Sequence, residues 1–299
     1  MSAPFRSGLI ALIGRPNVGK STLLNRLVGS KISITSHRPQ TTRYRTLGIH
    51  TTAQAQYVYV DTPGLHPAEG RHLNRYLNRT ATGSLAGVDC VALMISADGW
   101  RAEDEYPLTL ARRLSLPVIL VINKIDRVKD RKRLLPLIEE SAAKMRFAEI
   151  VPLCARTGEY VPELERALLP YLPEQPPIYP EDQITDKDER FLAAELIREQ
   201  VFRGFGQEVP YAAAVSIERL RRAKGIRHIA AIIWVEKEGQ KAILIGKAGE
   251  RLKTVGRNAR LAMQKSFGEK VYLELWVKVR RSWSDSESAL RTLGYRAED

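Results

Sequence analysis

The stretch Gly14-Arg-Pro-Asn-Val-Gly-Lys-Ser21 decides how the first half of this chain folds. It follows the apolar run Gly8–Ile13, a predicted strand, and it opens Lys20–Val28, a predicted helix. Its glycines allow backbone angles that turn several N–H groups inward, and the helix N-terminus adds a partial positive charge. A loop of this kind binds phosphate groups, with Lys20 reaching the β- and γ-phosphates and the Ser21 hydroxyl ligating Mg²⁺.

Further apolar runs alternate with polar, helix-like stretches along the first half of the chain. The predicted strands after the first are Gln56–Val60, Val88–Ile95, Pro117–Ile122 and Ile150–Leu153. This alternation predicts an α/β fold, with a mostly parallel sheet and helices on both of its faces.

A second motif, Asp61-Thr-Pro-Gly64, comes directly after Gln56–Val60 and 40 residues after Ser21. An acid at the carboxyl end of a strand, beside the phosphate loop, can hold the Mg²⁺ shell through water. The Gly64 N–H can contact a γ-phosphate. Asp-x-Pro-Gly is also an ordinary turn sequence, but its place downstream of a phosphate loop favours the functional interpretation.

A third motif, Asn123-Lys-Ile-Asp126, follows the apolar run Val118–Ile122. The Asp126 carboxylate can accept hydrogen bonds from the N1–H and 2-amino groups of guanine. Adenine has neither donor, so such a site separates GTP from ATP. Lys124 can lie along the base plane and Asn123 can bridge loops. A polar loop cap is the alternative interpretation, and the phosphate loop upstream argues against it.

The composition changes at a cluster of prolines: Pro170, Pro173, Pro176, Pro177 and Pro180. Because proline fixes φ and cannot continue a helix, we predict a stiff, extended linker. The chain then divides into a first domain over 1–172, a linker over 173–187 and a second domain over 188–299.

The second half of the chain has a different order of predicted elements, α-β-β-α-α-β followed by a final helix. This order predicts an α+β domain. The predicted elements are the helix Glu189–Phe202 capped by Asp188, the strands Ala212–Ile217 and His228–Val235, the apolar run Ala242–Ile245, an amphipathic helix over Leu252–Phe267, the alternating strand Val271–Val279 and the helix Ser286–Leu293.

The turn Gly246-Lys-Ala-Gly249 joins two of these predicted helices in a basic part of the chain. Residues 219–281 hold 17 Lys/Arg against 5 Asp/Glu, so this stretch carries nearly all of the net charge of +13. A Gly-x-x-Gly turn brings the backbone and a helix dipole close to a nucleic-acid strand. A solvated basic face is the alternative interpretation. The predicted RNA contacts are Gly246, Lys247, Ala248, Gly249, Arg251, Lys253 and Arg257.

The three nucleotide motifs resemble those of the translation-factor-like P-loop GTPases, which implies GTP hydrolysis. The resemblance implies a switch threonine at Thr42, with Thr41 as the alternative. It implies Mg²⁺ ligands at Ser21, Thr42 and Asp61, and catalytic roles for Lys20, Thr42 and Gly64. The implied nucleotide contacts are Gly14, Arg15, Pro16, Asn17, Val18, Gly19, Lys20, Ser21, Asp61, Thr62, Pro63, Gly64, Leu65, Asn123, Lys124, Ile125, Asp126, Cys154, Ala155 and Arg156.

Three positions qualify this resemblance. Cys154-Ala-Arg156 matches the family's last motif with cysteine in place of serine; we expect the Ala155 N–H to contact guanine from a looser loop. Leu65 stands where many GTPases carry a glutamine that orients the attacking water, so intrinsic hydrolysis should be slow. Asn17 occupies the phosphate-loop position that helps to bind K⁺ in related GTPases with a hydrophobic replacement, which implies stimulation by K⁺.

The second half resembles a type II KH domain, and the whole chain resembles the Era family of GTPases. This resemblance implies GTP-dependent binding of 16S rRNA near its 3′ end during assembly of the 30S ribosomal subunit, by a cytoplasmic monomer. It also implies peripheral association with the inner membrane, which the basic stretch permits.

Several other classes fit less well. A ribosome-assembly GTPase with two G domains needs a second phosphate loop, and a tRNA-modifying relative needs a cysteine after Cys154. A non-catalytic RNA-binding scaffold that nucleotide merely stabilises stays open as an alternative, since Leu65 mildly favours it.

The longest apolar run, Leu116–Ile122, is too short to span a bilayer, and we expect no signal peptide. Cys90 and Cys154 are typical of reduced thiols, and the five histidines are not spaced for a metal site.

Overall fold

The computed structural model describes residues 4–38, 41–64, 72–206 and 208–293. The chain forms two compact units. The N-terminal unit comprises Met1–Ser33, Thr42–Ala68 and Leu77–Asp186, and the C-terminal unit comprises Ile34–Thr41, Glu69–Tyr76 and Lys187–Asp299. The division is not a single cut, because the short segment Ile34–Thr41 belongs with the second half of the chain.

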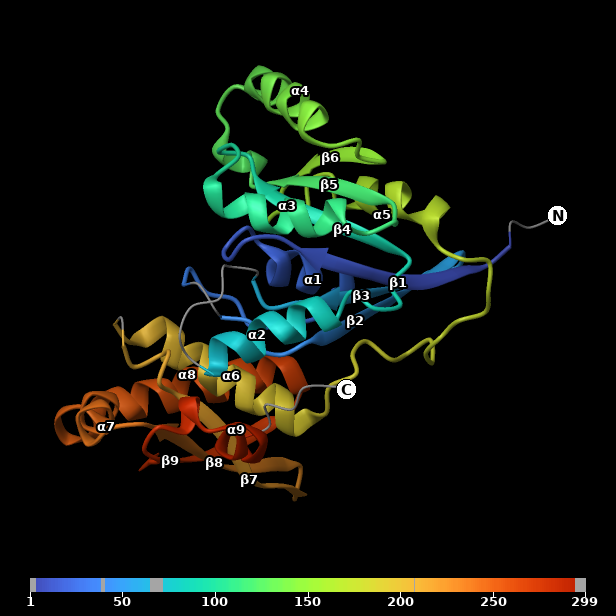
Figure 1. The fold of residues 1–299 in the computed structure, drawn as a ribbon. Helices are drawn as coiled ribbons and strands as arrows, with labels where there is room; N and C mark the ends of the chain where they lie inside the picture. The colour runs from blue at the N-terminus through green and yellow to red at the C-terminus, as the bar shows by residue number, and fades with distance from the viewer. Residues whose placement is uncertain (1–3, 39–40, 65–71, 207, 294–299) are drawn as a thin grey trace. The chain divides into compact units, whose positions relative to one another are not determined.

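The described residues of the N-terminal unit contain a six-stranded sheet in the order β2-β3-β1-β4-β5-β6 (Figure 1). Its strands are β1 (Arg6–Ile13), β2 (Thr46–Thr51), β3 (Ala55–Asp61), β4 (Cys90–Ser96), β5 (Val118–Asn123) and β6 (Glu149–Leu153). All neighbouring strands pair in parallel except β2 and β3, which are antiparallel. The predicted mostly parallel α/β sheet is therefore confirmed.

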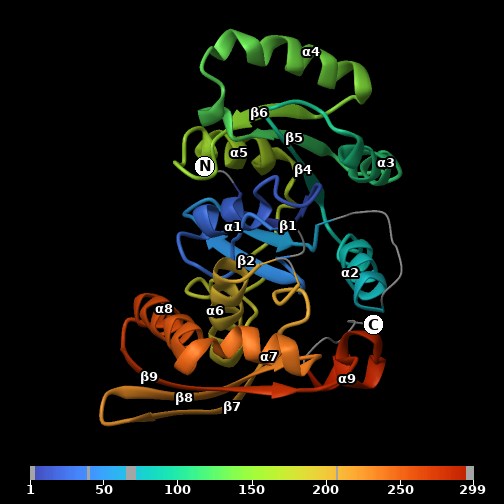
Figure 2. The same cartoon turned by 90° about the vertical axis from the view of Figure 1, so that its left-hand side faces the viewer.

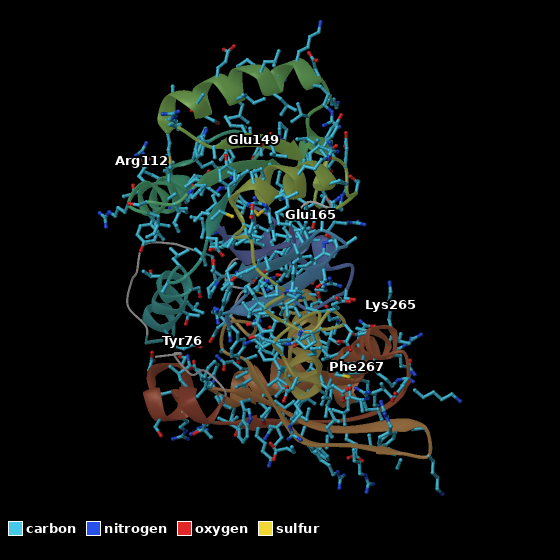
Figure 3. All side chains as sticks on the ribbon, turned by 90° about the vertical axis from the view of Figure 1, so that its right-hand side faces the viewer. Tyr76, Arg112, Glu149, Glu165, Lys265 and Phe267 are labelled. Carbon is cyan, nitrogen blue, oxygen red and sulfur yellow. The ribbon has the colours of Figure 1, made fainter. Side chains whose placement is uncertain are left out.

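Helices cover both faces of this sheet. They are α1 (Lys20–Val28), α2 (His72–Gly83), α3 (Glu105–Arg112), α4 (Leu134–Lys144) and α5 (Val161–Leu168). Ala81 of α2, Leu108 of α3 and Leu137 of α4 share one buried core with the strands. On α5, Glu165 lies 2.7 Å from His50 Nδ1 and accepts a hydrogen bond from the Tyr59 hydroxyl at 3.0 Å (Figure 3). This helix is thereby fixed over β2 and β3.

Among the described strands, β2 is the one that the sequence did not predict. Its residues Thr46–Thr51 include a glycine, a histidine and two threonines, so they form no apolar run. The strand exists because both of its edges are paired. One edge pairs with β3, and on the other Gly48 forms a bridge to Thr185.

The proline-rich segment, predicted as a stiff, extended linker over 173–187, is hydrogen-bonded to the N-terminal unit. The Ser7 N–H donates to the Pro173 carbonyl at 3.0 Å. The buried Gln56 amide accepts from the N–H groups of Ile178 and Tyr179 and donates to the Tyr179 carbonyl, at 2.8–2.9 Å. The segment therefore belongs to the N-terminal unit, which ends at Asp186.

The C-terminal unit contains a three-stranded sheet in the order β7-β8-β9, with helices packed on it. Strands β7 and β8 are antiparallel, and β8 and β9 are parallel. The elements are α6 (Glu189–Gly204), β7 (Ala214–Ala223), β8 (Ile226–Val235), α7 (Glu238–Ile245), α8 (Glu250–Phe267), β9 (Lys270–Val279) and α9 (Glu287–Thr292). The predicted order of helices and strands is confirmed, although β7 begins two residues later than predicted and runs on to Ala223.

Helix α6 differs from the predicted amphipathic helix. Asp188 caps it as expected, because its Oδ1 accepts from the Phe191 N–H at 2.7 Å. However, the helix is buried on nearly all sides, and its buried residues include the charged Glu195, Arg198 and Glu199. Arg198 and Glu195 form an ion pair at 2.6 Å, so these buried charges neutralise each other.

In the described part of the chain, no helix is long and apolar enough to cross a membrane.

Candidate nucleotide site and RNA-binding turn

The phosphate loop leaves β1 and enters α1 on a backbone that only glycine allows at two positions. Gly14 has a φ of 150° and Gly19 a φ of 111°. A Cβ on Gly14 would lie 2.5 Å from the Met94 carbonyl oxygen, and one on Gly19 would lie 2.2 Å from the Asn123 amide nitrogen. Both contacts are shorter than real Cβ atoms show, so both glycines are required to bring the loop against β4 and β5.

Lys20 begins α1 and is buried inside the loop. Its ammonium donates to the carbonyls of Gly14 at 2.8 Å and Arg15 at 3.1 Å. Burial lowers the pKa of Lys20 to about 8, against the opposing attraction of the Asp61 carboxylate. A positive charge held inside the loop at the start of a helix suits the β- and γ-phosphates of a nucleotide.

Three predicted Mg²⁺ ligands converge beside Lys20. Ser21 Oγ lies 2.7 Å from Thr42 Oγ1 and donates to Asp61 Oδ2 at 2.8 Å. Asp61 is fully buried, and its Oδ1 has no hydrogen-bond partner among the described atoms. One buried carboxylate with an unused oxygen and two hydroxyls fit Mg²⁺, which is typically held by one or two carboxylates together with substrate phosphates.

The structure distinguishes Thr42 from its neighbour Thr41. The Thr41 hydroxyl donates to the Arg38 carbonyl at 2.7 Å and lies 2.7 Å from Ser36 Oγ. Only the Thr42 hydroxyl faces Ser21. Ser33, which the sequence analysis did not single out, also donates to Asp61 Oδ2, at 2.9 Å.

The second motif lies against the phosphate loop through its glycine. A Cβ on Gly64 would lie 2.9 Å from Cγ and 3.0 Å from Cα of Pro16, so a larger residue would displace the loop. Thr62 anchors the motif to β1, because its hydroxyl donates to the Leu12 carbonyl at 2.9 Å. Leu65 lies outside the described residues.

Asn123 connects three parts of the site, as predicted for a bridging residue. Its amide donates to the Val18 carbonyl at 2.7 Å. Its Oδ1 accepts from the N–H groups of Lys124 at 2.7 Å and Ala155 at 3.0 Å. The Ala155 N–H that we expect to contact guanine is thus hydrogen-bonded to Asn123, and its contact with the base stays a prediction. Lys124 donates to the Asn17 carbonyl and so closes over the phosphate loop.

Asp126, the carboxylate predicted to read the base, is held by the motif that carries the cysteine. Cys154 Sγ donates to Asp126 Oδ1 at 3.0 Å, and Arg156 pairs with Oδ2 at 2.7 Å. The hydrogen bond from Cys154 is the main cause that lowers the pKa of Asp126, so the carboxylate is ionised and ready to accept. The Cys154 backbone is closed by hydrogen bonds with Gly158 and Glu159, so the replacement of serine leaves the turn intact.

Arg15 has partners that the sequence analysis missed. Its guanidinium lies 3.0 Å from the buried Asp104 and 3.8 Å from Asp98. Asp104 also accepts from the Arg101 N–H at 3.0 Å. The Arg15 side chain therefore anchors the phosphate loop to the segment before α3. The sequence carried no signal for this pairing, because the two residues are 89 positions apart.

The Gly246–Gly249 turn joins α7 to α8, as predicted for a nucleic-acid clamp. Gly246 and Gly249 have φ values of 71° and 76°, and Ala248 between them has a φ of 52°. A Cβ on Gly246 would lie 2.8 Å from Cγ of Arg251. Lys247 and Ala248 are exposed at the tip.

The predicted cations of α8 are accessible to a polyanion, although Arg251 also donates to the Ile243 carbonyl at 3.5 Å. Arg251, Lys253 and Arg257 are exposed; Lys253 and Arg257 lie on the side of the helix away from the buried Val255 and Ala259, and Arg251 lies beside the Gly246 turn. Not every basic residue of this unit has that role. Arg227 is buried, pairs with Glu189 at 2.9 Å and lies 4.4 Å from the ring centroid of Phe267 (Figure 3).

A phosphate loop with the Asn123–Asp126 motif beside it, followed by a Gly-x-x-Gly turn between helices, defines a P-loop GTPase joined to a KH domain. Residues 9–124 match the family described as 50S ribosome-binding GTPase, and residues 208–284 match the KH domain family.

Proteins that are similar along the whole chain identify one family within this class of GTPases. GTPase Era of Coxiella burnetii is 52% identical over 98% of this chain and 99% of its own length. GTPase Era of Stenotrophomonas maltophilia is 52% identical over 98% of both chains. A crystal structure of Era in complex with MgGDPNP and nucleotides 1506–1542 of 16S ribosomal RNA has a TM-score of 0.94 at 42% identity, over 98% of this chain and 100% of that one. A variant of Aquifex aeolicus Era bound to GDP·AlF4⁻ matches with the same values. This chain belongs to the Era family of GTPases.

Proposed function

We propose that this GTPase binds 16S rRNA near its 3′ end, in a manner controlled by the bound guanine nucleotide, and acts in assembly of the 30S ribosomal subunit. The observation that carries this proposal is the similarity over 98% of the chain to an Era structure that contains both a GTP analogue and that RNA. The Gly246–Gly249 turn and the exposed cations of α8 supply a chemically suitable surface.

For GTP hydrolysis, we assign the contacts to the residues that the structure brings together. Lys20 would bind the β- and γ-phosphates, and Ser21, Thr42 and Asp61 would hold Mg²⁺. A bound Mg²⁺ neutralises charge that develops on the phosphate oxygens. The Gly64 N–H would donate to the γ-phosphate. Asp126 would read the guanine edge, supported by Cys154 and by the loop over Ala155 and Arg156.

The proposed coupling between nucleotide and RNA has a physical basis in the segment Ile34–Thr41. Within the C-terminal unit, the Thr35 N–H donates to Glu199 Oε1 at 3.1 Å, and Arg198 donates to the Thr41 carbonyl. Thr42, the next residue, belongs to the N-terminal unit and lies against Ser21. A change in the position of Thr42 on hydrolysis is thus transmitted covalently to residues bound to α6.

Four finer points belong to the same proposal. Asn17 has a φ of 63° in the phosphate loop, and we propose that it supports stimulation by K⁺. We further propose that the protein acts as a monomer in the cytoplasm and contacts the inner membrane peripherally through its basic surface. Turnover that is identical in Na⁺ and K⁺ buffers would eliminate the K⁺ proposal.

A titration of RNA ending in the 3′ sequence of 16S rRNA, combined with a hydrolysis assay, tests this function. We expect GTP turnover that is slow without RNA, and RNA binding that Lys247→Gln weakens. The slope of log K for RNA binding against log[salt] is here called the salt slope. Lys247→Gln should also lower its magnitude by about 0.7, the value for one cation that contacts a single strand. Binding without any GTP turnover, in the presence or absence of RNA, would instead support the alternative of a non-catalytic scaffold.

A further inference from the structure

The sheet of the C-terminal unit has two faces of different character. Alternate residues of β8 and β9, such as Ile229, Ile233, Val271 and Val277, form the core shared with α6 and α8. Figure 2 shows these helices on one side of the sheet that β7, β8 and β9 form. Because side chains alternate along a strand, the residues between these core positions form the opposite face. We call it the outer sheet face.

The strand register identifies which residues share the outer sheet face. Two cross-strand rows run across β7, β8 and β9, with Arg221, His228 and Tyr272 in one and Ser216, Ile232 and Trp276 in the other. A third row contains Trp234 and Lys278. Tyr272 is 52% exposed and Trp276 is 46% exposed, which is unusual for rings of this size.

Two of the aromatic positions on this face are held in place by polar neighbours. Tyr272 lies against the His228 ring, with centroids 5.5 Å apart. Trp234 donates its indole N–H to Ser216 Oγ at 2.9 Å, and Lys278 Nζ lies 5.9 Å from the centroid of the Trp234 ring. These contacts restrict the Tyr272 and Trp234 rings, which lowers the entropy that binding at those rings must overcome.

Cations lie between and beside these rings. Arg221, Lys270 and Lys278 are exposed, while Arg219 lies 3.5 Å from Glu274. Glu274 is thus paired, and Glu218 beside this face accepts a hydrogen bond from Ser216 Oγ at 3.0 Å, so the cations of the face outnumber its acids. Cores of protein–protein interfaces are depleted of lysine, so interleaved rings and lysines fit a polyanion with flat bases better than they fit another protein.

We propose that the outer sheet face is a second binding surface for single-stranded RNA, separate from the Gly246–Gly249 turn. Bases stack on Tyr272 and Trp276, and phosphates contact Arg221, Lys270 and Lys278. The two exposed rings are four residues apart on β9, or roughly 13 Å at about 3.3 Å per residue, so one strand that spans both must be extended along β9. This goes beyond the KH turn, and it extends the RNA contact to the other face of the sheet.

The test is a fluorescence titration of the full chain with oligouridylate of about 16 nucleotides, the upper end of single-strand site sizes. Stacking on Trp276 should quench tryptophan emission. Tyr272→Ala and Trp276→Ala should each weaken binding at least about fivefold, the smaller end of measured stacking contributions. Trp276→Phe should keep most of the affinity and lose most of the quenching. Tyr106→Ala, which removes an exposed tyrosine from the N-terminal unit, is the matched control and should bind like the wild type.

A second set of variants separates this surface from the turn. In a Lys247→Glu background, which weakens the turn, Trp276 quenching should persist. Arg221→Gln should lower the magnitude of the salt slope by about 0.7. Unchanged affinity in both alanine variants, with unchanged unfolding temperatures, would overturn the inference while leaving the proposed function intact. Trp276 emission that shifts with phosphatidylglycerol vesicles but not with RNA would also overturn it, in favour of a lipid surface. No RNA binding by the wild type would contradict the proposed function itself.

Discussion

Single residues around Asp126, the carboxylate proposed to read the base, hold it in a defined position. Asp126 accepts hydrogen bonds from the buried Cys154 thiol and from Arg156, whose own side chain is 77% exposed. The exposed Arg156 can move away when a base arrives, whereas Cys154 stays behind the carboxylate. Because a carboxylate needs its charge to accept from guanine N1–H, the thiol acts by orienting Asp126 and by keeping its pKa low.

The first prediction concerns this thiol. Cys154→Ala removes the donor, while Cys154→Ser keeps a hydroxyl at the same place. A hydrogen bond to a charged group is worth roughly 1.5–3 kcal/mol, and a thiol lies at the weak end, so we expect Cys154→Ala to lower GDP affinity about tenfold. Cys154→Ser should bind GDP at least as well as the wild type. Titration with a fluorescent GDP analogue measures both, and equal affinities for the alanine and serine variants would contradict the assignment.

A pH dependence follows from Lys20. Burial lowers the pKa of Lys20 to about 8, below its pKa in the unfolded chain. The ionised side chain therefore reduces the free energy of unfolding at neutral pH. This reduction disappears as the pH rises from 8 toward the pKa of the unfolded chain. Phosphates require the ionised form. Above pH 8, nucleotide binding should therefore take up a proton, and GDP affinity should fall with rising pH. Calorimetry in two buffers of different ionisation enthalpy detects this uptake at pH 9; none at that pH would contradict the account.

The pair formed by Arg15 and Asp104 predicts a stability effect. Asp104→Asn leaves the buried Arg15 guanidinium short of its main counter-charge, and breaking a buried pair typically costs about 3–5 kcal/mol. We expect the lower end, since Asp98 lies 3.8 Å away. Urea unfolding should show this loss, whereas Glu103→Gln, an exposed acid next to Asp104 in the chain, should change little. Equal effects of the two substitutions would show that the pair does not anchor the loop.

At the scale of elements, local patterns predicted most strands and helices but not all of their roles. The five apolar runs of the N-terminal unit became β1, β3, β4, β5 and β6 because buried parallel strands need continuous apolar sequence. Strand β2 and the bound proline segment escaped prediction. Their hydrogen-bond partners, such as Gly48 for Thr185, are far apart in the sequence, so no local pattern encodes them.

The bound proline segment gives a prediction for Gln56. This fully buried side chain serves three backbone groups of Ile178 and Tyr179, and Gln56→Ala would leave them without partners. We expect a loss of about 2–3 kcal/mol in the free energy of unfolding, and faster hydrogen exchange at Ile178 and Tyr179. Gln54→Ala, at an exposed neighbouring position, is the control. Exchange that is unaffected by Gln56→Ala would mean that the segment is held by other contacts.

For the whole molecule, the site motifs were predictable because each is a short loop at the end of a strand. Lys20, Asp61 and Asp126 lie where their sequence context predicted, around one end of the sheet. Ser33 and Asp104 were not predictable, because they reach the site through tertiary structure alone. The assignment of Ile34–Thr41 to the C-terminal unit also needed the structure, although Thr41 and Thr42 are adjacent.

The central claim is that guanine nucleotide controls RNA binding through this segment. Its most direct test is the affinity of the protein for RNA ending in the 3′ sequence of 16S rRNA, measured in GDP and in a non-hydrolysable GTP analogue at one salt concentration. Coupling free energies between linked sites are typically 1–3 kcal/mol, so we predict binding at least about fivefold tighter with the analogue. Equal affinities in the two nucleotide states would contradict the account.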